Sequence, residues 1–125
     1  MIYRMRIYEP VRANLPLFHD FFRTQLLPVQ LRHGARLIGR WETDDGRVVA
    51  VWEYDDRAAY ERIEAAVRSD PDSVKAQQRR SRLPPLITAQ QETFMTSTVP
   101  GDWMSATVAS IFGSAQQADG ATGAD

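Results

Sequence analysis

A β-hairpin is the feature of this sequence that most restricts its fold. Two runs in which apolar and polar residues largely alternate, 35–42 and 47–54, flank the dipeptide Asp45-Gly46. Alternation with a period of two is typical of strands with one buried face, and Asp-Gly tolerates the positive φ angles of a tight turn. The sequence therefore predicts two antiparallel strands joined at this turn.

The length of the turn decides which side chains share a face of the hairpin. With Asp45-Gly46 as a two-residue loop, Trp41 pairs with Ala50, and Trp52 pairs with Gly39 and covers it. The residues expected on this face are Leu37, Gly39, Trp41, Ala50, Trp52 and Tyr54, with Arg40, Glu42 and Glu53 on the other. A bulge would shift this assignment by one residue.

Segments on both sides of the hairpin predict an α+β fold. Residues 2–8 alternate as a strand, with Tyr3, Met5 and Ile7 on one face and Arg4, Arg6 and Tyr8 on the other. A helix over 15–33, kinked by Pro28, a helix over 57–69 capped by Asp55 or Asp56, a helix over 71–82 capped by Asp70, and a strand over 86–95 complete the domain. This is the β-α-β-β-α-β order of a ferredoxin-like sandwich, whose uncovered sheet face favours a symmetric partner.

Charge and composition exclude several classes of function. The chain has 15 Lys+Arg against 16 Asp+Glu, so it has no field that would attract nucleic acid. It has no cysteine for thiolate metal sites and no apolar run that spans a membrane. We expect a cytoplasmic protein that binds neither nucleic acid nor membranes, with one domain over 1–99. The tail, 100–125, is expected to form a short helix over 102–112 and then to be disordered.

The motifs, taken in order, resemble those of the NIPSNAP domain. They are Arg6-x-Tyr8, Leu26-Leu27-Pro28, His33-Gly34-Ala35, Leu37-x-Gly39-x-Trp41, Trp52-Glu53-Tyr54 and Asp70-Pro71. The resemblance covers about residues 2–95 and implies the dimeric α/β-barrel fold, a homodimer whose two sheets enclose a central space. Ser73 departs from the family, which often has an aromatic residue after the Asp-Pro pair. No cofactor is implied.

Two groups of side chains are candidates for ligand binding. Trp41, Trp52 and Tyr54 would suit a flat hydrophobic ligand, or they simply fill the sheet core. Arg6 and Tyr8, together with Arg4, would hold a carboxylate or phosphate in an enclosed space. Alternatively, these arginines pair with glutamates across the dimer. The arginines at the end of the last helix, Arg79, Arg80 and Arg82, are expected on a solvated face.

His33 is the candidate catalytic residue, as a proton donor near a pocket, or else it is only a cation favoured by a helix C-terminus. His19 is expected to be solvated, and two distant histidines predict no metal site. Glu42 and Glu53 are expected to form ion pairs with Arg40 or with a first-strand arginine, the alternative being a general base.

The function expected is that of a small dimeric α/β-barrel protein that binds a flat hydrophobic molecule. The alternative is a cofactor-independent monooxygenase or isomerase acting on an aromatic or polyketide-like substrate, because the wider superfamily includes such enzymes. In that case His33 or an arginine of the first strand would donate the proton. A purely structural interaction module is a third hypothesis. The sequence contains no GxGxxG, P-loop, GxSxG or HExxH motif.

Overall fold

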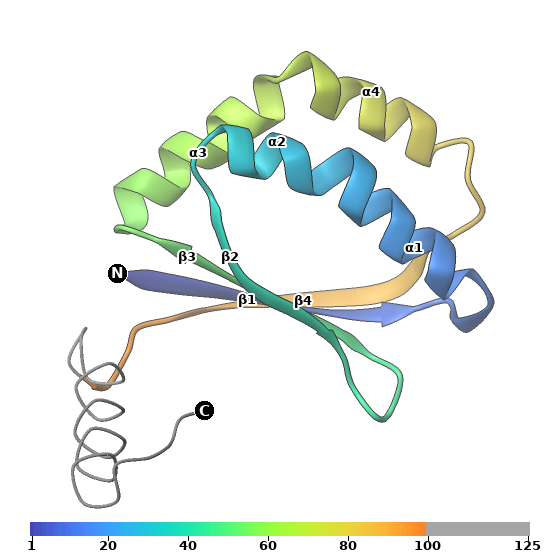
Figure 1. Ribbon diagram of the computed structural model, residues 1–125, viewed down its shortest axis with the longest axis horizontal. Helices are drawn as coiled ribbons and strands as arrows, with labels where there is room; N and C mark the ends of the chain where they lie inside the picture. The colour runs from blue at the N-terminus through green and yellow to red at the C-terminus, as the bar shows by residue number, and fades with distance from the viewer. Residues whose placement is uncertain (100–125) are drawn as a thin grey trace, which may run out of the picture.

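The computed structural model describes residues 1–99, in which a four-stranded antiparallel sheet is covered by helices on one face (Figure 1). The elements are β1 (Ile2–Pro10), the 3-10 turn η1 (Arg12–Asn14), α1 (Leu15–Phe21), the π-helical turn η2 (Phe22–Leu26), α2 (Leu27–Arg32), β2 (Arg36–Glu42), β3 (Val48–Tyr54), α3 (Arg57–Ser69), α4 (Pro71–Arg80) and β4 (Ile87–Met95). The strand order is β2-β3-β1-β4. The predicted ferredoxin-like α+β architecture is confirmed.

β1 lies between β3 and β4, and its two faces differ in character. Arg4 pairs with Trp52 of β3 and with Phe94 of β4, and these even-numbered residues face the helices. Met5 pairs with Val51, and the odd-numbered residues lie on the uncovered face, which we call the open face. The mixed face of β1 therefore points toward the helices, whereas its apolar face is the open one.

The predicted hairpin register is wrong by one residue. The amide of Gly46 donates to the carbonyl of Thr43 at 3.0 Å, and the amide of Thr43 donates to the carbonyl of Arg47 at 2.8 Å. Gly46 has φ +86°. This is a three-residue loop ending in a left-handed glycine, not a two-residue turn centred on Asp45-Gly46. Strand pairing therefore slips by one residue, which moves the side chains of most of β2 to the opposite face.

The slip separates the two tryptophans of the hairpin. Trp41 pairs with Val49 and lies on the open face, whereas Trp52 faces the helices. A Cβ at Gly39 would overlap the indole of Trp41, so the ring that covers this glycine is Trp41 and not Trp52. A bulge between Leu37 and Gly39 returns Leu37 to the helix side, opposite Trp52.

Glu42 and Glu53, expected on one side, lie on opposite faces for the same reason. Glu53 pairs in the strand with Arg36, and its carboxylate bonds to the Arg36 guanidinium at 2.8 Å and the Tyr3 hydroxyl at 2.9 Å. These two bonds hold the pKa of Glu53 below its usual value, and the bond to Arg36 has the larger effect. The predicted ion pairing of Glu53 is confirmed, although its partner is Arg36.

Pro28 interrupts the first helix as predicted, through a change of hydrogen bonding. Pro28 has no amide hydrogen, and its ring would clash with a carbonyl one α-turn earlier. The chain widens into η2, where the amide of Leu27 donates to the carbonyl of Phe22, five residues earlier. The helix predicted over 15–33 is therefore α1, η2 and α2 in succession.

Local signals at the ends of the other helices are confirmed. Asp56 caps α3 by accepting from the amide of Ala59 at 2.7 Å, and Asp70 caps α4 by accepting from the amide of Asp72 at 2.8 Å. α4 ends at Arg80, earlier than the predicted Arg82. Within residues 1–99 no helix is long and apolar enough to cross a membrane. The predicted tail helix, 102–112, lies outside the described residues.

Two clusters of buried side chains fill the layer between the sheet and the helices. The first contains Phe18, Phe21, Val48, Ala76 and Leu86. The second contains Ala35, Ala50, Trp52, Tyr54 and Ile63. A cavity borders both clusters, and it holds the polar side chains of β1.

Candidate functional site

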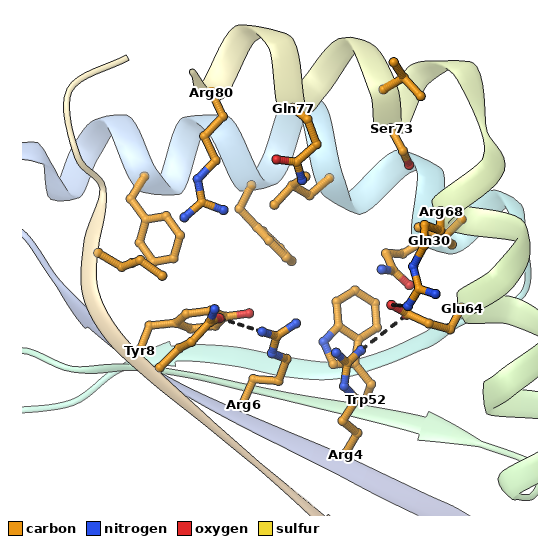
Figure 2. A pocket seen from close by; sticks show the side chains of 17 residues that line it. Arg4, Arg6, Tyr8, Gln30, Trp52, Glu64, Arg68, Ser73, Gln77 and Arg80 are labelled. Atoms are coloured by element: carbon orange, nitrogen blue, oxygen red, sulfur yellow. Dashed lines mark hydrogen bonds and ion pairs between the residues drawn. The ribbon is translucent and has the colours of Figure 1, made fainter. Parts of the chain in front are cut away.

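A cavity of about 400 Å³ lies between the helix-facing side of the sheet and the helices (Figure 2). We call it the sheet–helix cavity. Its floor includes Arg4, Arg6 and Tyr8, which alternate along β1, and Trp52 of β3. The resemblance implied a space between two sheets, whereas this cavity belongs to a single chain.

The π-helical turn η2 supplies apolar side chains to the cavity wall. Phe22 and Leu26 begin and end this turn, and both line the cavity. The rings of Phe22 and Trp52 meet edge to face, with centroids 6.1 Å apart and planes at 61°. Pro28, by forcing the wide turn, therefore shapes the apolar wall of the site.

One face of α4 forms part of the roof. Ser73, Gln77 and Arg80 follow each other at four- and three-residue spacing, which places them on one side of a helix. Figure 2 shows all three extending from α4 toward the cavity. Arg80 was expected on a solvated face, and the spacing of these three polar residues is the signal that could have placed it at a site.

Ion pairs neutralise one end of the cavity floor. Arg4 is only 5% exposed, and it pairs with Glu92 of β4 and, at 3.9 Å, with Glu64 of α3. Burial is the largest single influence and would lower the pKa of Arg4, but the bond to Glu92 and the interactions with Tyr54 and Tyr60 together outweigh it, and the pKa is raised. Arg68 also pairs with Glu64, at 3.3 Å. Arg4 thus has in the same chain the glutamate partners that were expected across a dimer.

Arg6 has different surroundings at the other end of the floor. Its Nη2 donates to Oε1 of Gln90 at 2.6 Å, and its guanidinium carbon lies 5.3 Å from the centre of the Tyr8 ring. Its Nε is buried and has no hydrogen-bond partner among the described residues. Arg6 therefore contacts neutral groups where Arg4 contacts carboxylates.

Not all predicted binding residues come together. Arg6, Tyr8 and Trp52 line the sheet–helix cavity, whereas Trp41 lies on the open face and is 52% exposed. Tyr54 packs beneath α3 against Tyr60 rather than lining the cavity, and burial raises its pKa.

A polar chain beside the cavity was not anticipated from the sequence. Arg40 lies over the rings of Phe18 and Phe22, 4.9 and 4.3 Å from their centres, and burial lowers its pKa. Its Nη1 donates to Nδ1 of His19 at 2.8 Å. Because Nδ1 accepts this bond, the ring hydrogen is on Nε2, which donates to the carboxylate of Glu42 at 3.1 Å. His19, expected in solvent, thus links Arg40 to Glu42. The register slip, which turned Arg40 inward, explains why this chain was missed.

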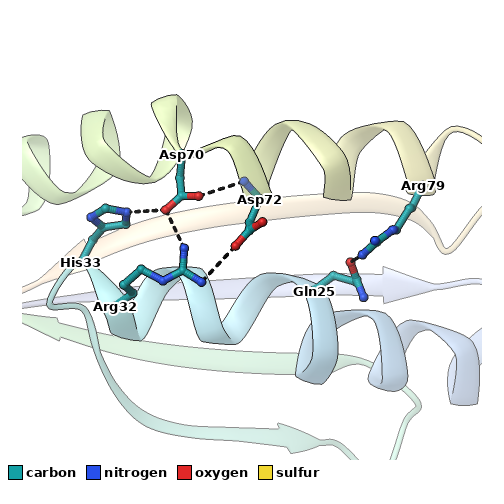
Figure 3. Close-up of polar contacts among 6 residues, drawn as sticks. All are labelled: Gln25, Arg32, His33, Asp70, Asp72 and Arg79. Carbon is teal, nitrogen blue, oxygen red and sulfur yellow. Dashed lines mark hydrogen bonds and ion pairs between the residues drawn. The ribbon is translucent and has the colours of Figure 1, made fainter.

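His33 is not among the residues that line the cavity. Its Nε2 donates to Oδ2 of Asp70 at 2.8 Å, and Arg32 bridges Asp70 and Asp72 at 2.9 and 3.0 Å (Figure 3). The bond from His33 is the largest of several that hold the pKa of Asp70 below its usual value. This group ties the end of α2 to the start of α4. In the described part of the chain, no three His, Asp or Glu side chains gather as a metal site requires.

Comparisons with known proteins place these features in a wider group. The NIPSNAP family model matches residues 3–100. A NIPSNAP domain protein from Burkholderia xenovorans is 25% identical, with a TM-score of 0.69 over 80% of this chain and 99% of the other. A NIPSNAP family protein from Agrobacterium tumefaciens is 21% identical, with a TM-score of 0.68 over 78% and 92%.

A more distant structural similarity is to a proposed antibiotic biosynthesis monooxygenase from Nitrosomonas europaea. It is 11% identical, with a TM-score of 0.57 over 80% of this chain and 100% of the other, which shows a shared fold alone. None of the curated proteins matches the chain.

Proposed function

The chain belongs to the NIPSNAP family, and we propose that it is a homodimeric protein that binds a flat hydrophobic small molecule in the sheet–helix cavity. The observation that carries this proposal is the cavity itself. Its volume of about 400 Å³ lies in the usual range for small-molecule sites. Aromatic walls with a few polar groups are the usual composition of such sites.

The proposed occupant is flat because of the shape of the apolar wall. Phe22 and Trp52 meet edge to face on one side, and Phe18 continues the wall toward Tyr8. Rings arranged in this way offer extended contact to a planar molecule. The polar side chains on β1 and α4 would fix its orientation.

A second copy of the chain is the proposed cover of the open face. Tyr3, Met5, Ile7, Val49 and Val51 of this face are partly exposed in the single chain, and Trp41 is 52% exposed. A continuous apolar surface of this kind favours self-association. Because the cavity is on the other side of the sheet, a dimer formed through the open face would leave it accessible. Sedimentation of the purified chain tests this, since a 14.2 kDa monomer at all concentrations would refute the dimer.

Ser73 allows a direct test of the binding site. It lines the cavity from α4, so Ser73→Trp would fill part of the space, whereas Gln78→Trp places the same side chain on α4 outside the lining. Native mass spectrometry of the purified protein should detect a small molecule that remains with the wild type and with Gln78→Trp but is lost from Ser73→Trp. Equal retention by both variants would place the ligand elsewhere.

The monooxygenase or isomerase alternative stays a prediction. Of the two proton donors considered for it, His33 bonds to Asp70 away from the cavity lining, whereas Arg6 lines the cavity. The retained molecule, once identified, should be incubated with the protein under oxygen. Turnover that survives His33→Ala but not Arg6→Gln would favour this alternative over simple binding.

A further inference from the structure

We infer that the ligand of the sheet–helix cavity carries a carboxylate and that Arg6 and Arg80 bind it. The inference rests on the proposed binding function and adds the chemical class of the ligand. It follows from how the charges of the cavity lining are distributed and from the neutral partner of Arg6.

The cavity lining carries more positive than negative charge. Four arginines line it, Arg4, Arg6, Arg68 and Arg80, against the single glutamate Glu64. Arg4 and Arg68 share Glu64, and Arg4 also bonds to Glu92. The available carboxylates are therefore concentrated at the Arg4 end of the floor.

Arg6 and Arg80 have no carboxylate within ion-pair distance among residues 1–99. Figure 2 shows Arg6 rising from β1 and Arg80 descending from α4 into the same cavity. Two guanidinium groups that enter one space from opposite walls both favour an anion in that space.

Neighbouring positions on β4 explain why Arg4 is neutralised and Arg6 is not. On the helix-facing side, β4 presents Glu92 opposite Arg6 and Gln90 opposite Tyr8. Glu92 bonds to Arg4, whereas Gln90 bonds to Arg6 through an amide oxygen. The amide orients the Arg6 guanidinium without cancelling its charge, which leaves that charge available to a ligand.

The free edge of Arg6 matches a carboxylate. Its Nη2 donates to Gln90 and its Nε is buried, whereas no hydrogen bond among the described residues engages its Nη1. The two Nη groups at the end of a guanidinium can donate in parallel to the two oxygens of a carboxylate. The aromatic wall of Phe22 and Trp52 would then contact the planar body of the same molecule.

The test compares two ligands of nearly identical shape, 2-naphthoate and its neutral analogue 2-naphthamide. Calorimetric titration of the full chain should show the carboxylate binding about 10- to 100-fold more tightly, the range expected for hydrogen bonds to a charged group. Arg6→Gln and Arg80→Gln should each reduce this preference. Arg62→Gln, which removes a guanidinium from an exposed position of α3 outside the lining, should keep it. Circular dichroism checks that each variant is folded.

The outcomes separate the two proposals. If both ligands bind with equal affinity, the cavity binds small molecules but does not select an anion, and the inference is refuted while the binding function stands. If the preference persists in both Arg6→Gln and Arg80→Gln, the anion is held elsewhere and the assignment is wrong. If neither ligand binds at millimolar concentration, the inference fails and the proposed function loses its support.

Discussion

Two adjacent valines on β3 provide a sharp test of which face of the sheet is covered by the helices. Val48 is fully buried beneath the helices in the cluster of Phe18 and Phe21, whereas Val49 lies on the open face and is partly exposed. The same substitution, Val→Ala, can be made at both positions. It removes the same atoms from the same strand, so any difference in effect reports the surroundings.

The stability that Val48→Ala loses can be estimated from the burial of Val48. Removing two methyl groups forfeits about 1.6 kcal/mol of transfer free energy, at about 0.8 kcal/mol for each carbon. A residual void of about 50 Å³ adds about 1 kcal/mol if the helices do not collapse onto it. Val48→Ala should therefore lower the free energy of unfolding by about 2–3 kcal/mol, which corresponds to a fall in Tm on the order of 10 °C for a domain of this size.

Val49→Ala should behave differently because its side chain faces the proposed partner. In the isolated chain its cost should be below about 1 kcal/mol, since the side chain is already in partial contact with water. Urea denaturation at several protein concentrations measures both variants. If the open face is an interface between two copies, the effect of Val49→Ala appears as weaker association and depends on concentration, whereas that of Val48→Ala does not.

Two results would refute this reasoning. A cost below about 1 kcal/mol for Val48→Ala would mean that the helices do not pack on this side of β3 as described. An equal, concentration-independent cost at both positions would mean that the two faces are covered within one chain, which would remove the basis for the proposed dimer.

Three further predictions concern the caps and the cavity. Asp70→Asn should destabilise the chain at neutral pH, because the pKa of Asp70 is lowered in the folded chain. The stabilisation by the Asp70 carboxylate is present above the ordinary carboxyl pKa, roughly 4, and is lost as the pH falls below it. In thermal unfolding between pH 7 and 3, the difference in Tm between Asp70→Asn and the wild type should become smaller toward pH 3. A difference in Tm that stays constant with pH would contradict the ion-pair role. Gly34→Ala should cost about 1 kcal/mol in urea unfolding because Gly34 has φ +101°, and a neutral result would mean that this turn tolerates a side chain. Arg6→Met should leave stability unchanged or raise it by about 1 kcal/mol, since it removes a buried donor without an acceptor, and it should reduce the carboxylate preference. A large loss of stability would instead mean that Arg6 is needed for the fold.

Features encoded in a few consecutive residues could be predicted from the sequence. Asp56 and Asp70 cap their helices, Gly34 ends α2 with a positive φ, and Pro28 breaks the first helix near the expected place. Each depends on the conformational preference of one residue and its immediate neighbours. The order of strands and helices followed from these signals together with the period of the apolar residues.

The faces of β2 could not be predicted because they depend on a single residue in the loop. Asp45-Gly46 fits either a two-residue or a three-residue hairpin, and the hydrogen bonds of Thr43 select the longer one. The choice reverses the positions of Arg40 and Trp41. A short pattern of this kind identifies the hairpin reliably but leaves its register open.

The cavity was hidden by a second ambiguity, in β1. Alternation grouped Arg4, Arg6 and Tyr8 on one face, but apolar residues on the other face gave the usual reason to bury that other face beneath helices. The structure has the opposite arrangement, since the polar face is under the helices and the apolar face is open. The open face of β1 carries Tyr3, Met5 and Ile7, as a face covered by helices would, so hydrophobicity could not distinguish the two.

This inverted polarity of β1 is itself an argument that the sheet–helix cavity has a function. Two arginines under a helical layer bring a desolvation cost, and apolar side chains of similar volume would fill the same space at lower cost. At Arg4 the cost is offset by Glu64 and Glu92, so structure alone accounts for it. At Arg6 no carboxylate in the described chain offsets it, and Gln90 holds the side chain in place while leaving its charge intact. The packing of the fold does not require a cation at position 6, whereas recognition of an anion does. The comparison of Arg6→Met in stability and in carboxylate binding therefore separates the two explanations at a single position.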